Sequence, residues 1–80
     1  MNDLKGRLAG CFSNVFPNIR QDEIPRASTA SLAAWDSVAQ VTLLSSVAEE
    51  FGLDFDVEQF EELVSYALIL DYLETKSVNG

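Results

Sequence analysis

Apolar residues recur at spacings of three and four in several stretches of the chain, which is the pattern of amphipathic α-helices. The first stretch predicts a helix that ends near Phe16, because Pro17 cannot continue the hydrogen-bond ladder. The apolar positions of this helix are Leu4, Leu8, Cys11, Phe12, Val15 and Phe16. No stretch alternates apolar and polar residues for long enough to predict a sheet.

The second stretch predicts the most regular helix, from about Val38 to Phe51, with Gly52 as the residue expected just past a helix C-terminus. Val38, Val41, Leu44, Val47 and Phe51 lie along one side of this helix. Residues 17–36 form a long connection before this helix, and such a loop in a compact domain needs apolar anchors. The candidate anchors are Ile19, Ile24, Leu32 and Trp35, and we expect the tryptophan to fill the core.

Two further helices are predicted, a short one around residues 57–64 and a final one around 66–75. The last apolar stripe comprises Leu63, Ala67, Leu70 and Leu73, widened by Leu68, Ile69 and Tyr72. The pattern predicts an all-α fold, a small four-helix antiparallel bundle with a short third helix and a long loop between helices 1 and 2. We expect one domain over residues 1–80, with its core over about 4–75 and a frayed tail at 76–80.

The composition removes several kinds of site. The chain has no histidine, the commonest general base and metal ligand. Its single cysteine, Cys11, excludes an internal disulfide and is expected to be a small buried hydrophobe. Asp54, Asp56 and Glu58 alternate as in an EF-hand loop, but Gln59 stands where that loop needs glycine, so we reject a calcium site.

The charge is strongly acidic and unevenly distributed. The formal net charge is −8, and ten acidic residues but no basic one lie between Ala27 and Thr75. Such a field repels nucleic acid and anionic membranes and attracts partners with positive surfaces. The N-terminus lacks the pattern of a signal peptide, and residues 27–48 are too polar to span a bilayer. We expect a soluble cytoplasmic monomer.

Ser37 is the main candidate for chemistry, because it opens the second helix directly after a polar loop. We do not expect self-contained nucleophilic catalysis, since no histidine can activate the serine and Asp36 is too weak a base. Ser37 and Gln40 fit the Ser-x-x-Gln form of a capping box, so the serine has a structural role available. Besides a nucleophile or a helix cap, Ser37 could be a site of covalent modification, because a helix N-terminus accommodates phosphate.

The landmarks around this serine fall at spacings shared with a known family. The Asp36-Ser37 pair opens the second helix, and Glu49-Glu50 precede Phe51-Gly52 at its end. The segment Asp71-Tyr72-Leu73-Glu74 then follows without a gap. Together, over residues 4–75, these features resemble the acyl carrier protein family.

The resemblance implies a carrier and not an enzyme. In that family a carrier-protein synthase, a phosphopantetheinyl transferase, moves 4′-phosphopantetheine from coenzyme A to the serine with Mg²⁺. Carried over here, Ser37 is the attachment site and Asp36 helps to hold the metal during transfer. The cargo then travels as a thioester on the arm to the enzymes of fatty-acid-like or specialised-metabolite biosynthesis.

The resemblance also implies partners, which are acyl-loading and condensing enzymes with basic docking patches. The residues expected to meet them are Val38, Thr42, Glu49, Glu50, Glu58, Glu61 and Glu62. Ala39, Thr42 and Ala48 stand where fatty-acid carriers often have acidic residues, so the front half of the second helix is almost neutral. This departure points to a specialised carrier and away from a housekeeping one.

Two other functions stay open from the sequence. An aminoacyl or peptidyl carrier, or a D-alanyl carrier, would use the same Ser37 chemistry with different cargo. A helical interaction module that is never modified belongs to another class, and it would resist every carrier-protein synthase.

Overall fold

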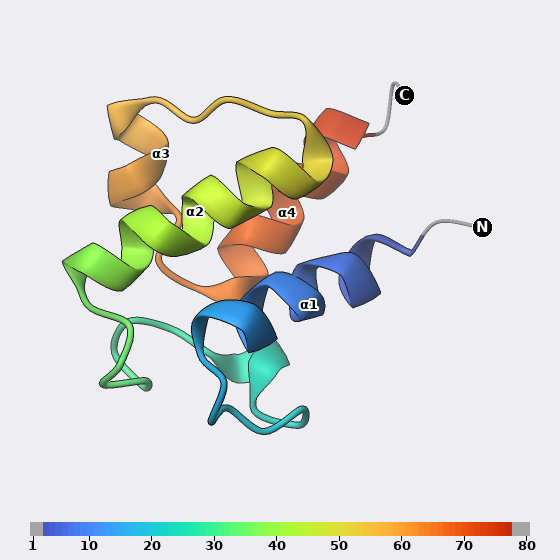
Figure 1. The fold of residues 1–80 in the computed structure, drawn as a ribbon. Coiled ribbons are helices and arrows are strands. Elements are labelled where there is room, and N and C mark those ends of the chain that lie inside the picture. Colours follow the sequence, from blue (N-terminus) through green and yellow to red (C-terminus); the bar gives the residue numbers. More distant parts are fainter. Residues whose placement is uncertain (1–2, 78–80) are drawn as a thin grey trace.

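The structure, a computed structural model, describes residues 3–77 and has four α-helices in that range (Figure 1). They are α1 (Leu4–Val15), α2 (Ser37–Phe51), α3 (Val57–Glu62) and α4 (Tyr66–Ser77). A short 3₁₀ helix, η1 (Ile24–Arg26), lies within the first long loop. The described residues form no β-strand, and the predicted all-α bundle with a short third helix is confirmed.

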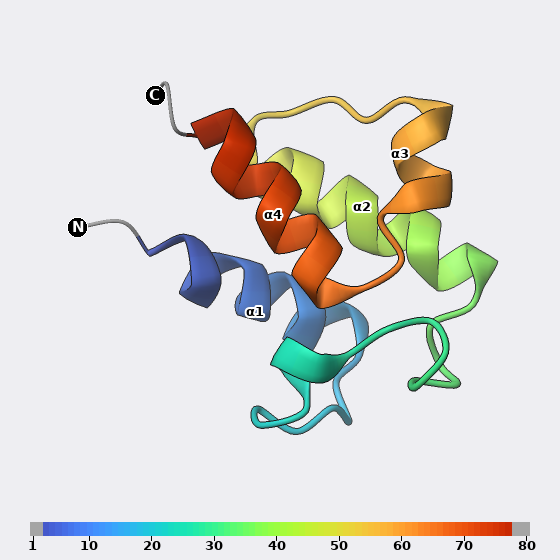
Figure 2. The same cartoon turned by 180° about the vertical axis from the view of Figure 1, so that it is seen from behind.

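The helices surround one cluster of buried side chains. α1 packs against both α2 and α4, while α3 packs against α2. In Figure 1 α2 crosses in front of α4, and Figure 2 shows α1 and α4 from the other side. The largest fully buried side chains are Phe12, Leu8, Ile24, Leu43, Leu44, Ile69, Leu73 and Val47. The middle of α2 therefore forms part of the core through Leu43, Leu44 and Val47.

The long loop before α2 is held against the bundle by side chains and by its backbone. The Thr29 N–H donates to the Val64 carbonyl at 3.0 Å, and the Tyr66 N–H donates to the Ala27 carbonyl at 2.9 Å. These two bonds join the loop to the connection between α3 and α4. The predicted anchors are confirmed as two buried residues, Ile24 and Trp35, and two half-buried ones packed on the core, Ile19 and Leu32.

The helix ends follow local chemistry. Gly52 has a φ of 67°, the left-handed conformation that glycine adopts readily, and it ends α2 as predicted. α4 extends through Lys76 to Ser77, the first two residues of the predicted frayed tail, and fraying there stays a prediction. The Lys76 ammonium lies 5.4 Å from the centre of the Tyr72 ring, and a cation also suits the negative end of the helix dipole. Residues 78–80 of the predicted tail lie outside the described residues.

The apolar stripe along one side of α2 is buried only in its second half. Val38 and Val41 are 74% and 53% exposed, whereas Leu44 and Val47 are buried. Gln40 replaces the two valines on the inner face, together with Leu43. The physical reason is that the loop and α3 present polar groups at the start of α2, and a glutamine can bond to them where a valine cannot.

The predicted stripes of the last two helices also need correction. In α4, Leu68 is 46% exposed and Ala67 is exposed, while Tyr66, Ile69 and Leu73 face the core. Because α4 begins at Tyr66, its buried positions follow that residue at spacings of three and four. The third helix ends at Glu62 and not near residue 64, since the carbonyls at its end bond to a side chain of α2, described below.

Candidate functional site

Asp36 and Ser37 form the junction between the long loop and α2. Asp36 is the N-cap residue, and its Oδ1 atom accepts a hydrogen bond of 2.9 Å from the Ala39 backbone N–H. Its backbone is extended, with φ −98° and ψ −171°, as is usual for this position. The interpretation of Ser37 as the cap is therefore wrong, because the carboxylate one residue earlier already satisfies the free N–H. Ser37 is instead the first residue of the helix.

The Ser37 side chain is exposed, and its hydroxyl makes no hydrogen bond within residues 3–77. It stands at the N-terminus of a helix of 15 residues, where unpaired N–H groups and the helix dipole favour an anion. The second Asp36 oxygen, Oδ2, also has no partner in the described part of the chain. A carboxylate oxygen is a ligand that Mg²⁺ accepts. The junction can therefore accept a phosphate group on Ser37, and Asp36 Oδ2 could supply one ligand to a metal ion that a substrate brings.

Gln40, one turn further along α2, connects three segments around this junction. Its Oε1 atom accepts a hydrogen bond from the Trp35 indole N–H in the loop. Its Nε2 atom donates to the Phe60 carbonyl at 3.0 Å and to the Leu63 carbonyl at 2.8 Å. We call these three hydrogen bonds the Gln40 bridge. It ties the loop that precedes Ser37, and α2 itself, to the end of α3.

The Gln40 bridge is buried and complete. Gln40 and Trp35 are only 7% and 2% exposed, and no buried side-chain nitrogen or oxygen of the described residues lacks a partner. Removing one member of such a network typically leaves buried polar groups unpaired, at a cost of about 1–3 kcal/mol each. The prediction that Trp35 fills the core is confirmed, but the bridge was missed. The available signal was that a buried tryptophan N–H needs an acceptor, and Gln40 is the near polar candidate.

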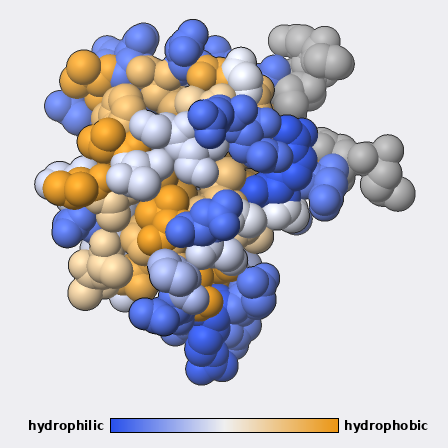
Figure 3. Space-filling model, viewed as in Figure 1, coloured by the Kyte–Doolittle hydropathy of each residue, from blue (hydrophilic) through white to orange (hydrophobic). Residues whose placement is uncertain are grey.

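The exposed side chains on the first turns of α2 after Ser37 carry no charge and include two valines. Val38 and Val41 lie on the outer face of α2, where the Thr42 hydroxyl donates to the Val38 carbonyl at 3.2 Å. Val57, 72% exposed, opens the neighbouring α3. In Figure 3 orange and pale residues cover the region of the first half of α2, and blue residues gather towards its C-terminal end. The exposure of Val41 was not predicted.

The predicted acidic residues fall into two separate groups. Glu58, Glu61 and Glu62 are exposed on α3, which the Gln40 bridge holds beside the first turns of α2. Glu49 and Glu50 are exposed near the other end of α2, about 20 Å from Ser37 at 1.5 Å per residue.

Glu50 is already engaged within the chain. Its Oε2 atom forms an ion pair of 2.8 Å with Arg7 Nε, and the same guanidinium donates to the Glu50 carbonyl at 2.6 Å. The Arg7 guanidinium also lies 4.5 Å from the centre of the Phe51 ring. The ion pair neutralises part of the negative charge at the C-terminal end of α2. Within residues 3–77, the glutamates of α3 form no ion pair with a basic side chain, and α3 is the helix held beside the start of α2.

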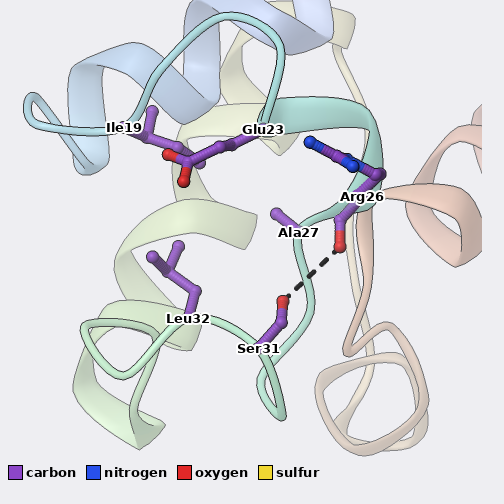
Figure 4. Close-up of a pocket in the computed structure, with 6 residues that line it drawn as sticks. All are labelled: Ile19, Glu23, Arg26, Ala27, Ser31 and Leu32. Atoms are coloured by element: carbon purple, nitrogen blue, oxygen red, sulfur yellow. Dashed lines mark hydrogen bonds between the residues drawn. The ribbon is translucent and has the colours of Figure 1, made fainter.

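A surface hollow of about 300 Å³ lies beside the long loop (Figure 4). Ile19, Ala27 and Leu32 supply its apolar wall, and Glu23 and Arg26 bring charges of both signs. A neighbouring hollow of about 220 Å³ shares part of this wall and continues to Ala34 and Ala39. Neither hollow is lined by Ser37 or by any member of the Gln40 bridge.

The structure also bears on three other features of the chain: its cysteine, its possible metal ligands and its possible membrane spans. Cys11 is buried, as predicted, and burial raises the pKa of its thiol, so it stays protonated at neutral pH and is not the thiol that would hold cargo. Among residues 3–77, no group of three or more histidine, cysteine, aspartate or glutamate side chains is placed to hold a metal ion. No helix in the described range has the length and apolar character needed to cross a membrane.

Comparison with known proteins gives the family. No family model and no solved structure matches the chain. The acyl carrier protein of Desulforapulum autotrophicum is 33% identical to it over 57 residues, which cover 71% of this chain and 74% of the relative. The chain belongs to the acyl carrier protein family. Members of this family are carriers and not enzymes, and they generally carry phosphopantetheine and interact with biosynthetic enzymes.

Proposed function

We propose that this chain carries acyl groups as thioesters on a 4′-phosphopantetheine arm attached to Ser37. The observation that supports this most is the exposed, unbonded Ser37 hydroxyl at the N-terminus of α2, directly after the capping Asp36. Membership of the family supports the carrier role. The geometry of the junction between the loop and α2 supports Ser37 as the residue to which the arm is attached.

Each residue of the junction has a distinct task in this proposal. The Ser37 oxygen attacks the phosphorus that bears the pantetheine arm of coenzyme A and gives up its proton to a base, while the pyrophosphate bond breaks and 3′,5′-ADP leaves. The first turn of α2 stabilises the resulting phosphodiester by about 0.3–1 kcal/mol. Asp36 caps the helix through Oδ1 and offers Oδ2 to the Mg²⁺ that accompanies coenzyme A. A phosphopantetheinyl transferase supplies the base, since the chain has no histidine. When bound, the arm supplies the thiol on which the cargo rides.

We propose further that partner enzymes meet an apolar patch beside the serine and an acidic patch on α3. The apolar patch consists of Val38, Val41 and Thr42, and the acidic patch consists of Glu58, Glu61 and Glu62. Glu49 and Glu50 lie farther along α2, and Glu50 is paired with Arg7. Such a surface suits acyl-loading and condensing enzymes that combine apolar contacts with a basic patch, and it supports a specialised carrier.

The function is tested by incubating the folded protein with coenzyme A, Mg²⁺ and a broad-specificity phosphopantetheinyl transferase. We expect the intact mass to rise by one phosphopantetheinyl group, and by one acyl-phosphopantetheinyl group when an acyl-coenzyme A replaces coenzyme A. A reaction containing a chelator of Mg²⁺ is the control. If a panel of transferases leaves the mass of the folded protein unchanged, the unmodified interaction module becomes the better account.

The two tasks of Asp36 can be separated by two substitutions. Asp36→Asn keeps a side-chain oxygen for the Ala39 N–H, so we expect little change in stability. It removes the carboxylate that would face Mg²⁺, so we expect the loading rate to fall about 10- to 100-fold. Asp36→Ala should slow loading similarly and also lower the free energy of unfolding by about 1 kcal/mol.

Urea denaturation and initial loading rates across a range of Mg²⁺ concentrations measure these two effects. A loading rate for Asp36→Asn equal to that of the unchanged protein would show that Asp36 acts only as a helix cap.

A further inference from the structure

We propose that the Gln40 bridge closes the interior of the bundle to the carried acyl chain, so that the cargo of this protein is a short or polar acyl group held outside the core. The inference rests on the proposed attachment at Ser37. It adds the class of cargo and a residue that determines it.

An acyl chain attached near Ser37 could reach the core by two routes. One passes between α2 and the loop that contains Trp35, and the other passes between α2 and α3. Gln40 lies three residues after Ser37, almost one full turn of the helix towards the core. Its Oε1 atom is bonded to the loop, and its Nε2 atom is bonded to two carbonyls at the end of α3. One side chain therefore crosses both routes. The hollow beside Ala34 and Ala39 lies outside the bridge, and a chain resting there would stay on the surface and not enter the core.

The space behind Gln40 is already filled. Leu43 and Leu44 on the next turn of α2 are fully buried. The Trp35 ring meets Phe12 edge-on, with 5.3 Å between ring centres and 83° between the ring planes. Phe12 in turn packs at 5.5 Å from the ring of Tyr66. An entering chain would have to displace close-packed rings as well as break the bridge.

The bridge makes entry costly for any cargo. Breaking it leaves the Trp35 N–H, the Gln40 amide and the Phe60 and Leu63 carbonyls buried without partners. Only a long apolar chain gains enough from burial to oppose that cost, because the gain grows with each buried methylene group. Short or polar acyl groups gain little by entering and lose little by staying in water, so they match a closed bundle.

The test compares the protein loaded on Ser37 with acetyl, hexanoyl and decanoyl groups, after intact mass has confirmed each product. The indole N–H signal of Trp35, the single tryptophan, reports the bridge by NMR without ambiguity. We expect this signal and the melting temperature to be the same for all three chains. A shift of the indole signal together with a melting temperature that rises with chain length would overturn the proposal.

The role of Gln40 is tested in the Gln40→Ala variant, with Ser45→Ala on the exposed face of the same helix as the matched control. In Gln40→Ala, the decanoyl form should melt about 4–8 °C above the acetyl form, as expected for an additional interaction of moderate strength in a domain of this size. In Ser45→Ala, the two forms should melt together. If Gln40→Ala also shows no dependence on chain length, Gln40 is not what closes the bundle.

The unchanged protein keeps the proposal testable even if Gln40→Ala fails to fold. Trp35→Phe then serves as the second variant, because it removes the indole donor and retains an aromatic ring. In Trp35→Phe, the decanoyl form should melt above the acetyl form, by less than the about 4–8 °C expected when the whole bridge is lost. In Ser45→Ala the two forms should melt together. Equal melting temperatures for the two forms of Trp35→Phe would count against the bridge. A protein that gains no mass at all contradicts the proposed function and not this inference.

Discussion

Replacing Ser37 by alanine is expected to abolish attachment of the arm and to leave the fold intact. The substitution removes the hydroxyl that forms the ester, and no other group at the start of α2 can replace it. The helix keeps its cap, because the bond to the Ala39 N–H comes from Asp36. Alanine also suits the first turn of a helix. We therefore expect no mass gain with any transferase and a free energy of unfolding within about 0.5 kcal/mol of the unchanged protein.

The control for this prediction is Ser45→Ala, which removes another exposed serine hydroxyl from α2. It should be loaded at the rate of the unchanged protein. Loading of Ser37→Ala would place the attachment site on another residue. A large loss of stability in that variant would mean that Ser37 has a structural part that the geometry does not explain.

Replacing Phe12 by alanine is expected to cause the largest loss of stability. Phe12 is fully buried and its ring packs against the rings of Phe16, Trp35 and Tyr66. A substitution of this kind typically costs about 3–5 kcal/mol, through lost burial and the cavity that remains. Domains of this kind have a total stability of only about 5–15 kcal/mol, so a sizeable fraction of the variant should be unfolded at moderate temperature.

Urea denaturation followed by Trp35 fluorescence measures this loss. Phe55→Ala is the matched control, because Phe55 is only half-buried and contacts the single ring of Tyr72. Its loss should be clearly smaller. Equal losses for the two variants would contradict the position of Phe12 at the centre of the core.

The positions of the helices could be predicted because each end carries a local signal. Pro17 follows the end of α1, and Gly52 supplies the left-handed residue that ends α2. Which face of α2 points inward could not be predicted in the same way. Val41 and Leu44 lie on one helical stripe and Gln40 and Leu43 on a neighbouring one, and periodicity alone does not choose between them. The choice depends on what the loop and α3 place opposite the helix.

The sequence could predict where the candidate site lies in the chain, but it could not predict the hydrogen bonds that surround the site. The spacing of Asp36 and Ser37 from the end of α2 marked the junction, but the same residues also fitted a capping box. The distinction between the cap and the exposed hydroxyl is a matter of one residue, and only the backbone conformation of Asp36 decides it. Two of the three bonds in the Gln40 bridge join residues that are 20 or more positions apart, so no local pattern contains the whole bridge.

The two patches near Ser37 change how docking is expected to depend on salt. The apolar patch of Val38 and Val41 is insensitive to ionic strength, whereas the glutamates of α3 act through charge. A partner that uses both should keep part of its affinity at high salt. The affinity that remains at high salt distinguishes the proposed docking surface from one that relies on acidic residues alone.

The most direct measurement is the mass of the peptide that contains Ser37, prepared from protein purified from the cells that make it. Fragmentation of that peptide locates any added group on a single residue. We predict one phosphopantetheinyl group on Ser37 in at least part of the protein. An unmodified Ser37 throughout, in folded protein from cells whose other carrier proteins bear the arm, would contradict the proposed function.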